Sequence, residues 1–330
     1  ALPIWSLPGG RSPPLRTQSK RKHVTHQFHS TVLREYDIRG VADRDLSDEL
    51  AEGIGIEVGH DGCFGKAEHE AARLHIARGI ARRTALEGFP KSFRQAGAEA
   101  EILVFRNLTA KHIDESIKAL AEQISKSQIL MFPGGFSAGD EPDGSAKFIA
   151  TIIRNPRVAD AIMDLLKNRE GLILGICNGF QALVKTGLVP YGEIRDATAD
   201  APTLVHNSLG RHISCYARTR VVSQLSPWLA DCESGDIHRV PVSHGEGKFF
   251  ASPEVIAALA ASGQIATQYC DADGAPSMDI AINPNGSLAA IEGITSPCGR
   301  VFGKMAHTER AGTQIAKNIP GEKHQPIFKA

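Results

Sequence analysis

The stretch GLILGICNGFQAL (171–183) constrains the fold of this chain more than any other. Residues 171–176 are almost continuously apolar, which is typical of a short strand buried on both faces of a sheet. A glycine-flanked turn at Cys177 follows, and residues 178–189 have the apolar spacing of a helix. A strand, a tight turn and a helix in this order predict an α/β domain.

The same alternation of apolar runs and helical spacing continues along the chain. It predicts a mostly parallel sheet covered by helices on its faces, because βα units join parallel strands. Pro156 is expected to interrupt the helical segment that contains it. The predicted strands are 100–105, 128–132, 171–176, 218–222, 238–242 and 288–292, and the predicted helices are 112–125, 148–168 and 178–189.

Composition excludes several classes of protein. The 330 residues include 37 Lys and Arg against 37 Asp and Glu, so bulk charge predicts neither nucleic-acid nor anionic-membrane binding. The sequence has no run of about 18 apolar residues, so we expect no membrane-spanning helix. The six cysteines form no CxxC pair, which predicts no disulfide framework, no structural metal and a reducing, cytoplasmic location.

Cys177 is the first candidate for chemistry. Its predicted place between a strand and a helix is the geometry of a nucleophile elbow, with cysteine in place of serine. The helix N-terminus would favour a thiolate, and the amide of Asn178 would lie where an oxyanion forms. The alternative is a buried structural cysteine in a β–α turn.

Two further motifs could complete such a site. PGG (133–135) follows a predicted strand, and Gly135 could supply a second oxyanion donor, although the motif could also be only a turn. His307 and Glu309 are spaced so that the histidine could serve the thiol as a base and the carboxylate could orient the imidazole. The alternative is an ordinary surface pair.

PGGFSAGD, GICNGFQAL and the late HTER together resemble class I glutamine amidotransferases. The longer stretches ILMFPGGFSAGDEPDGSAKFIATIIRNPRV, ICNGFQALVKTGLVPYGEI, PVSHGEGKF and GRVFGKMAHTERAG resemble the glutaminase domain of phosphoribosylformylglycinamidine synthase, from about Ala96 to Lys329. The resemblance implies a flavodoxin-like domain and a catalytic triad of Cys177, His307 and Glu309. The family's usual HPE or HSE is HTE here, and the middle position need not carry chemistry.

The resemblance also implies an activity. Glutamine would be hydrolysed through a thioester, with the oxyanion on the Gly135 and Asn178 amides, and the ammonia would serve the ATP-dependent conversion of formylglycinamide ribonucleotide to formylglycinamidine ribonucleotide. Gln181 would help to hold the substrate, or is a helix-surface residue. His244 and Glu246 line the ammonia exit or, as we favour, shape a turn. ATP and Mg are expected only on a separate synthetase domain or subunit.

The N-terminal part departs from this pattern. We expect an atypical, partly disordered leader over residues 1–90 and the amidotransferase domain over residues 91–330. Residues 1–34 contain six basic and no acidic residues, which favours either a transit peptide or a disordered or mis-joined leader. Residues 31–55 (TVLREYDIRGVADRDLSDELAEGIG) weakly resemble a phosphohexomutase N-terminus. The family's first, central strand is missing or replaced, so its sheet neighbours should have open edges.

Other functions remain as alternatives. The chain could be an inactive, truncated or rearranged fragment of the same synthase. It could also be a PfpI-like cysteine hydrolase or chaperone, although those proteins typically have His directly after the nucleophile, where this chain has Asn178. A phosphohexomutase ranks last, because that family's phosphoserine loop is absent from the sequence.

Overall fold

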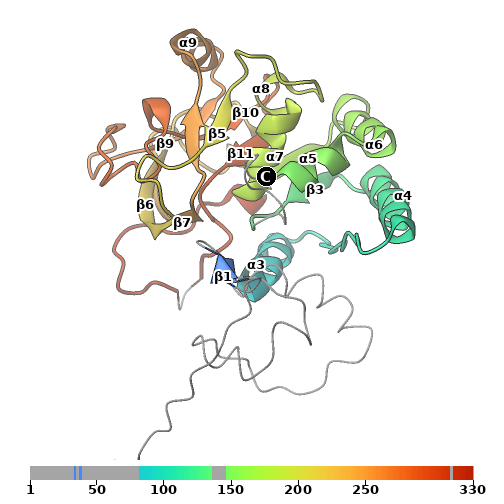
Figure 1. Cartoon of the computed structure of the whole chain (residues 1–330). Helices are drawn as coiled ribbons and strands as arrows, with labels where there is room; N and C mark the ends of the chain where they lie inside the picture. The colour runs from blue at the N-terminus through green and yellow to red at the C-terminus, as the bar shows by residue number, and fades with distance from the viewer. Residues whose placement is uncertain (1–32, 35–36, 39–81, 136–145, 313–314, 330) are drawn as a thin grey trace, which may run out of the picture.

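The structure of the chain is a computed structural model, and Figure 1 shows its course. Most of the predicted leader, including most of the mutase-like stretch, lies outside the described residues. Two short strands within it, β1 (Leu33–Arg34) and β2 (Asp37–Ile38), pair antiparallel. The structure describes residues 33–34, 37–38, 82–135, 146–312 and 315–329.

A seven-stranded sheet in the order β3-β4-β11-β10-β9-β6-β7 forms the centre of the domain. β3, β4 and β11 pair in parallel, and the other neighbours pair antiparallel. The predicted α/β class is confirmed, but the sheet is mixed, and among the described strands parallel pairing is confined to β3, β4 and β11. The strands are β3 (Ile129–Phe132), β4 (Leu172–Ile176), β6 (Ile213–Val221), β7 (Ile237–His244), β9 (Ile265–Tyr269), β10 (Ile291–Thr295) and β11 (Val301–Lys304), with β5 (Thr203–Val205) and β8 (Lys248–Phe250) as a separate antiparallel pair.

The helices follow the predicted alternation. The interruption at Pro156 is confirmed: α5 ends at Ile153, and the Asn155 side chain accepts a hydrogen bond from the Arg157 amide at the start of α6. Among the described residues, no helix combines the length and apolar character needed to cross a membrane. The helices are α3 (Arg82–Gln95), α4 (Ala110–Lys126), α5 (Lys147–Ile153), α6 (Pro156–Lys167), α7 (Asn178–Thr186), α8 (Leu188–Tyr191) and α9 (Pro253–Ala261), with short 3₁₀ turns at Pro227–Leu229, Leu288–Ala290 and Ile327–Lys329.

The predicted strand at residues 100–105 is wrong, because this segment has no regular structure. Its apolar residues still contact the domain, as when the Phe105 ring meets the edge of Phe148 at 5.6 Å, but Ile102 is 52% exposed. A strand needs a hydrogen-bonded neighbour, and β3 is the edge strand of the sheet within the described residues. Whether another segment replaces the family's first strand stays a prediction, because residues 39–81 lie outside the described residues.

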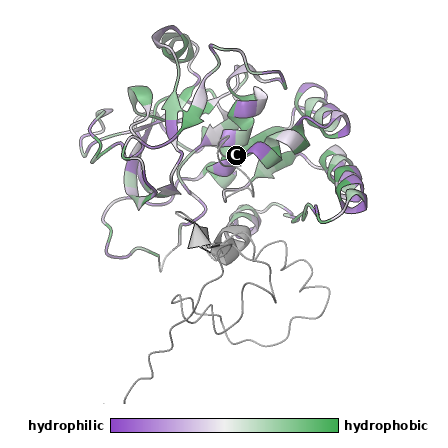
Figure 2. Cartoon of the chain, in the orientation of Figure 1, coloured by the Kyte–Doolittle hydropathy of each residue, from purple (hydrophilic) through white to green (hydrophobic). Residues whose placement is uncertain are grey.

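Helix α7 lies very close to the parallel strands because glycine occupies the contact points. A Cβ atom at residue 179 would lie 2.0 Å from the carbonyl oxygen of Phe132, and one at residue 303 would lie 2.0 Å from Cδ2 of Phe180. Figure 2 shows apolar residues concentrated on the central strands and polar residues on the outer surfaces of α4 and α6. The close packing places the N-terminus of α7 at the carboxyl ends of β3, β4 and β11.

Helix α3 spans the boundary predicted between residues 90 and 91. Phe89 and Phe93 belong to the hydrophobic core, and the Phe93 ring lies 5.0 Å from that of Phe328 near the C-terminus. At Gly88, an added Cβ atom would be 3.3 Å from Cγ of Glu309, so α3 packs directly against this acidic residue. Where the sequence analysis expected a replaced strand, the described part of the segment is a helix beside Glu309.

Candidate active site

Cys177 occupies the turn between β4 and α7, as predicted. Its backbone has φ 54° and ψ −108°, a strained conformation for a residue with a side chain. Two hydrogen bonds hold this turn: the Cys177 amide donates to the Lys304 carbonyl at 2.8 Å, and the Gln181 amide donates to the Cys177 carbonyl at 3.0 Å. The side chain therefore stands at the first turn of α7, where the helix dipole favours an anionic group.

His307 and Glu309 form a buried hydrogen-bonded pair, not a surface pair. His307 Nδ1 lies 2.7 Å from Glu309 Oε1, and both residues are less than 5% exposed. The His307 amide donates to the Pro241 carbonyl at 2.8 Å, which fixes the loop after β11 against β7. The carboxylate thus orients the imidazole and leaves Nε2 as its other polar atom.

The fold brings His307 and Cys177 together. A Cβ atom at residue 134 would lie 2.7 Å from His307 Cε1 and 3.2 Å from Cys177 Cβ, so Gly134 fits between the two side chains. His307 Nε2 is buried and has no hydrogen-bond partner of good geometry among the described residues, although the thiol lies beside it. An exchangeable proton and a nucleophilic sulfur are therefore enclosed in one site.

Electrostatics in this site keep His307 protonated. Burial alone lowers the pKa of the imidazole, but the Glu309 charge, the neighbouring Cys177 side chain and the hydrogen bond to Glu309 together raise the pKa to about 9. An imidazolium beside a thiol at neutral pH is the arrangement that cysteine hydrolases use to maintain a reactive sulfur.

Of the two residues predicted to stabilise an oxyanion, Asn178 directly follows Cys177, and Gly135 directly follows Gly134, which lies beside Cys177. Gly135 follows β3 with φ 139°, a backbone conformation that favours glycine, and Asn178 is the first residue of α7. The rest of the PGGFSAGD motif, from residue 136, lies outside the described residues. Gln181 is buried, so the surface alternative is wrong, and its Nε2 donates to the Glu246 carbonyl at 2.5 Å.

His244 lies near enough to His307 for the charge of that residue to act on it, although the favoured prediction for His244 was only to shape a turn. It is buried, neither ring nitrogen has a hydrogen-bond partner among the described residues, and burial followed by the charge of His307 lowers its pKa to about 3. The turn role also has support, because Asn207 donates to the His244 carbonyl at 2.7 Å and accepts from the Gly247 amide at 3.0 Å. The SHGEG motif was the sequence signal for this loop.

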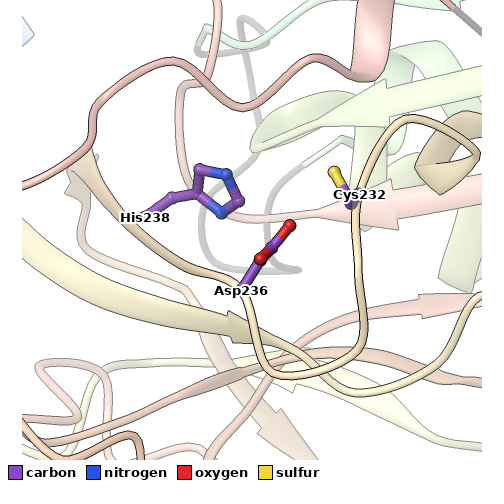
Figure 3. Close-up of side chains that lie close together, drawn as sticks. All are labelled: Cys232, Asp236 and His238. Carbon is purple, nitrogen blue, oxygen red and sulfur yellow. The ribbon is translucent and has the colours of Figure 1, made fainter.

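One cluster among the described residues has the composition of a metal site. Figure 3 shows Cys232, Asp236 and His238 with their ligand atoms turned toward one another, all within 4.8 Å. Burial raises the pKa of the Cys232 thiol to about 11 and lowers the pKa of His238, and the nearby Lys304 favours the deprotonated form of both groups, so an ionisable amine already lies beside the cluster. The protonated form of that amine would oppose a divalent cation.

Lys304 is the residue near the site that the sequence analysis missed. It ends β11, is completely buried, and donates to Thr308 Oγ1 at 2.6 Å and to Gln325 Oε1 at 2.8 Å. Lysine is normally exposed, so nothing in the stretch VFGKM indicated a buried ammonium.

Comparisons with known proteins point to one family. The profile of the CobB/CobQ-like glutamine amidotransferase domain matches residues 62–330, a range that begins inside the predicted leader. The phosphoribosylformylglycinamidine synthase subunit PurQ of Symbiobacterium thermophilum is 35% identical over 201 residues, which cover 61% of this chain and 77% of that protein. The subunit of the same name from Thermomicrobium roseum is 32% identical over 222 residues, which cover 67% and 85%.

A solved structure supports the fold. PurLQS from Thermotoga maritima superposes with a TM-score of 0.51 at 24% identity, covering 74% of this chain and 89% of the matched chain. The matched profile and the PurQ relatives show that the chain belongs to the CobB/CobQ-like glutamine amidotransferase family, among the PurQ-type members.

Proposed function

We propose that this chain hydrolyses glutamine to glutamate and ammonia as the glutaminase part of phosphoribosylformylglycinamidine synthase. The observation that carries the proposal is the buried set of Cys177, His307 and Glu309, in which His307 is hydrogen-bonded to Glu309 and lies with Cys177 beside Gly134. Relatives named as PurQ subunits of that synthase support the choice of reaction. The roles of the individual residues are our assignment.

In the first half-reaction, the Cys177 thiolate adds to the carboxamide carbon of glutamine. The negative charge that develops on the oxygen would rest on the amides of Gly135 and Asn178. His307, protonated at neutral pH, gives its Nε2 proton to the departing nitrogen. The C–N bond then breaks, ammonia leaves, and a glutamyl thioester and a neutral imidazole remain.

In the second half-reaction, neutral His307 removes a proton from water, and the hydroxide oxygen adds to the thioester carbon. The C–S bond breaks, glutamate leaves, and the imidazolium and thiolate are restored. Glu309 stabilises the imidazolium before the first half-reaction and after the second, through its 2.7 Å contact with Nδ1. In this scheme Gln181 helps to shape the substrate pocket, because its side chain donates a hydrogen bond to the Glu246 carbonyl.

The ammonia needs an acceptor, which this chain does not supply in our proposal. A synthetase domain or subunit would use ATP and Mg to activate formylglycinamide ribonucleotide, and ammonia from Cys177 would convert it to the amidine. PurLQS from Thermotoga maritima supports the idea of a multisubunit assembly. The cytoplasmic location predicted from the cysteine content belongs to the same proposal.

The test is glutamate release from glutamine by the purified chain, alone and with a separately purified synthetase partner. We expect turnover that Cys177→Ala abolishes, with Cys215→Ala as the matched control because Cys215 is an exposed thiol away from the set. If folded wild-type protein releases no glutamate with or without the partner, the alternative holds, and the chain is an inactive fragment of the synthase.

A further inference from the structure

Lys304 lies where the fold disfavours a charge: burial lowers the pKa of its amine, and the Glu292 and Glu309 charges act against that shift. Its side chain and that of Glu292 are both 0% exposed, with Nζ and Oε1 3.8 Å apart. Taking two charges out of water costs more than their attraction returns unless further hydrogen bonds satisfy them, and apolar replacements of such pairs are often neutral or stabilising. The stability of the core alone therefore does not explain a buried ammonium at this position.

The contacts of Lys304 connect the two halves of the active site. Its carbonyl oxygen accepts the Cys177 amide hydrogen bond that fixes the turn before α7. Its ammonium donates to the hydroxyl of Thr308, the residue between His307 and Glu309. One residue thus holds the turn that carries the thiol and the loop that carries the imidazole.

The partners of Lys304 hold the same loop at further points. The carboxylate of Glu292, the ion-pair partner of Lys304, accepts from the Ala306 amide at 2.7 Å, and the Glu292 carbonyl accepts from the Met305 amide at 3.1 Å. Gln325 Oε1, in the C-terminal segment, accepts from Thr308 at 2.8 Å as well as from the ammonium. The segment from Met305 to Thr308 is therefore fixed on both sides by the same buried network.

We propose that Lys304 is a positioning residue for glutamine hydrolysis, which acts through Thr308 to hold His307 in line with Cys177. The inference rests on the proposed function. In this view the buried Lys304 side chain serves to orient the imidazole, and not mainly to stabilise the core. Gln325 is the second anchor of the same hydroxyl, so the C-terminal segment takes part in shaping the site although it lies outside the triad.

The variants that test this are Lys304→Met, which keeps length and removes the charge, and Thr308→Val, which removes one hydroxyl at nearly constant shape. We expect each to lower kcat by about 10- to 100-fold while KM changes little, because small misplacement of reacting groups affects the transition state. Thr308→Ser retains the hydroxyl and should keep the wild-type kcat. Lys185→Met, at the far end of α7, is the matched control.

A double-mutant cycle tests the route of action. If Lys304 acts through Thr308, the combined variant should have nearly the kcat of Lys304→Met alone; multiplication of the two losses would overturn the proposal. Wild-type kcat in folded Lys304→Met or Thr308→Val would also overturn it. If Lys304→Met fails to fold, Thr308→Val with its serine counterpart decides alone.

A second readout separates this proposal from the proposed function. The rate of Cys177 alkylation by iodoacetamide at neutral pH needs the adjacent imidazolium but no glutamine turnover. We expect several-fold slower alkylation in Lys304→Met and Thr308→Val than in wild type, with Thr308→Ser and Lys185→Met unchanged. Silent wild-type turnover with this alkylation pattern would reject the proposed function and support the positioning role; equal alkylation in all variants would reject the positioning role.

Discussion

Replacement of Glu309 by Gln isolates the charge that keeps His307 protonated. Gln is nearly the same shape, and its carbonyl can accept the His307 Nδ1–H bond that now spans 2.7 Å to the carboxylate. The substitution therefore removes a charge and keeps a contact. Because both side chains are buried, solvent screens this charge little.

The magnitude follows from the pKa of His307. The folded protein raises that pKa from 6.5 to about 9, because the causes led by the Glu309 charge outweigh the burial that lowers it. The difference corresponds to about 3 kcal/mol of preference for the imidazolium, at about 1.4 kcal/mol per pKa unit. Since the folded-state pKa lies above the unfolded value, this stabilisation is fully present below about pH 6.5 and is lost as pH rises through about 9.

The assay is urea unfolding of wild type and Glu309→Gln at several values between about pH 6.5 and pH 9.5. Wild type should lose free energy of unfolding across this window, and Glu309→Gln should lose less, because burial then dominates and lowers the His307 pKa. Glu170→Gln, which removes an exposed carboxylate paired with Arg300, is the control for general charge effects. Parallel pH curves for wild type and Glu309→Gln would refute this electrostatic reasoning.

Three further predictions come from the same site. Gly134→Ala should abolish most glutamine hydrolysis in a folded protein, because its Cβ would lie 2.7 Å from His307 Cε1; activity near wild type in a kinetic assay would contradict this packing. His244→Asn should reduce the loss of stability on acidification, because the pKa of His244, lowered to about 3, gives stability that is present above about pH 6.5 and lost as pH falls toward 3; an unchanged acid limb of the unfolding curve would contradict this. Exhaustive chelation should leave glutaminase turnover unchanged and elemental analysis should find no stoichiometric zinc; loss of turnover restored by zinc would assign the Cys232 cluster a metal.

Much of the parallel part of the fold was predictable from the sequence, because its signals are local. A strand buried on both faces is apolar throughout, as β4 is, and the glycines around Cys177 indicate the close approach of α7. The position of Cys177 at the turn follows from that pattern alone. The spacing of His307 and Glu309, by contrast, predicted only a pair, and their place beside the thiol was expected from the resemblance.

The failures depend on interactions between distant segments. Residues 100–105 have the composition of a strand, but a strand also needs a neighbour, and composition does not report whether that neighbour exists. The antiparallel pairing of β6, β7, β9 and β10 is likewise set by the tertiary fold. Lys304 was missed because its burial depends on Glu292, Thr308 and Gln325, none of which is adjacent to it in the sequence.

The edge position of β3 among the described strands affects how the protein should behave in solution. Ile129–Phe132 contains four apolar residues and no charge, and on its outer side it has no strand partner within the described part of the chain. Sheet edges of this kind recruit strands from other molecules, and natural sequences usually guard them with a charged gatekeeper residue or proline. Concentrated samples should therefore become turbid with time.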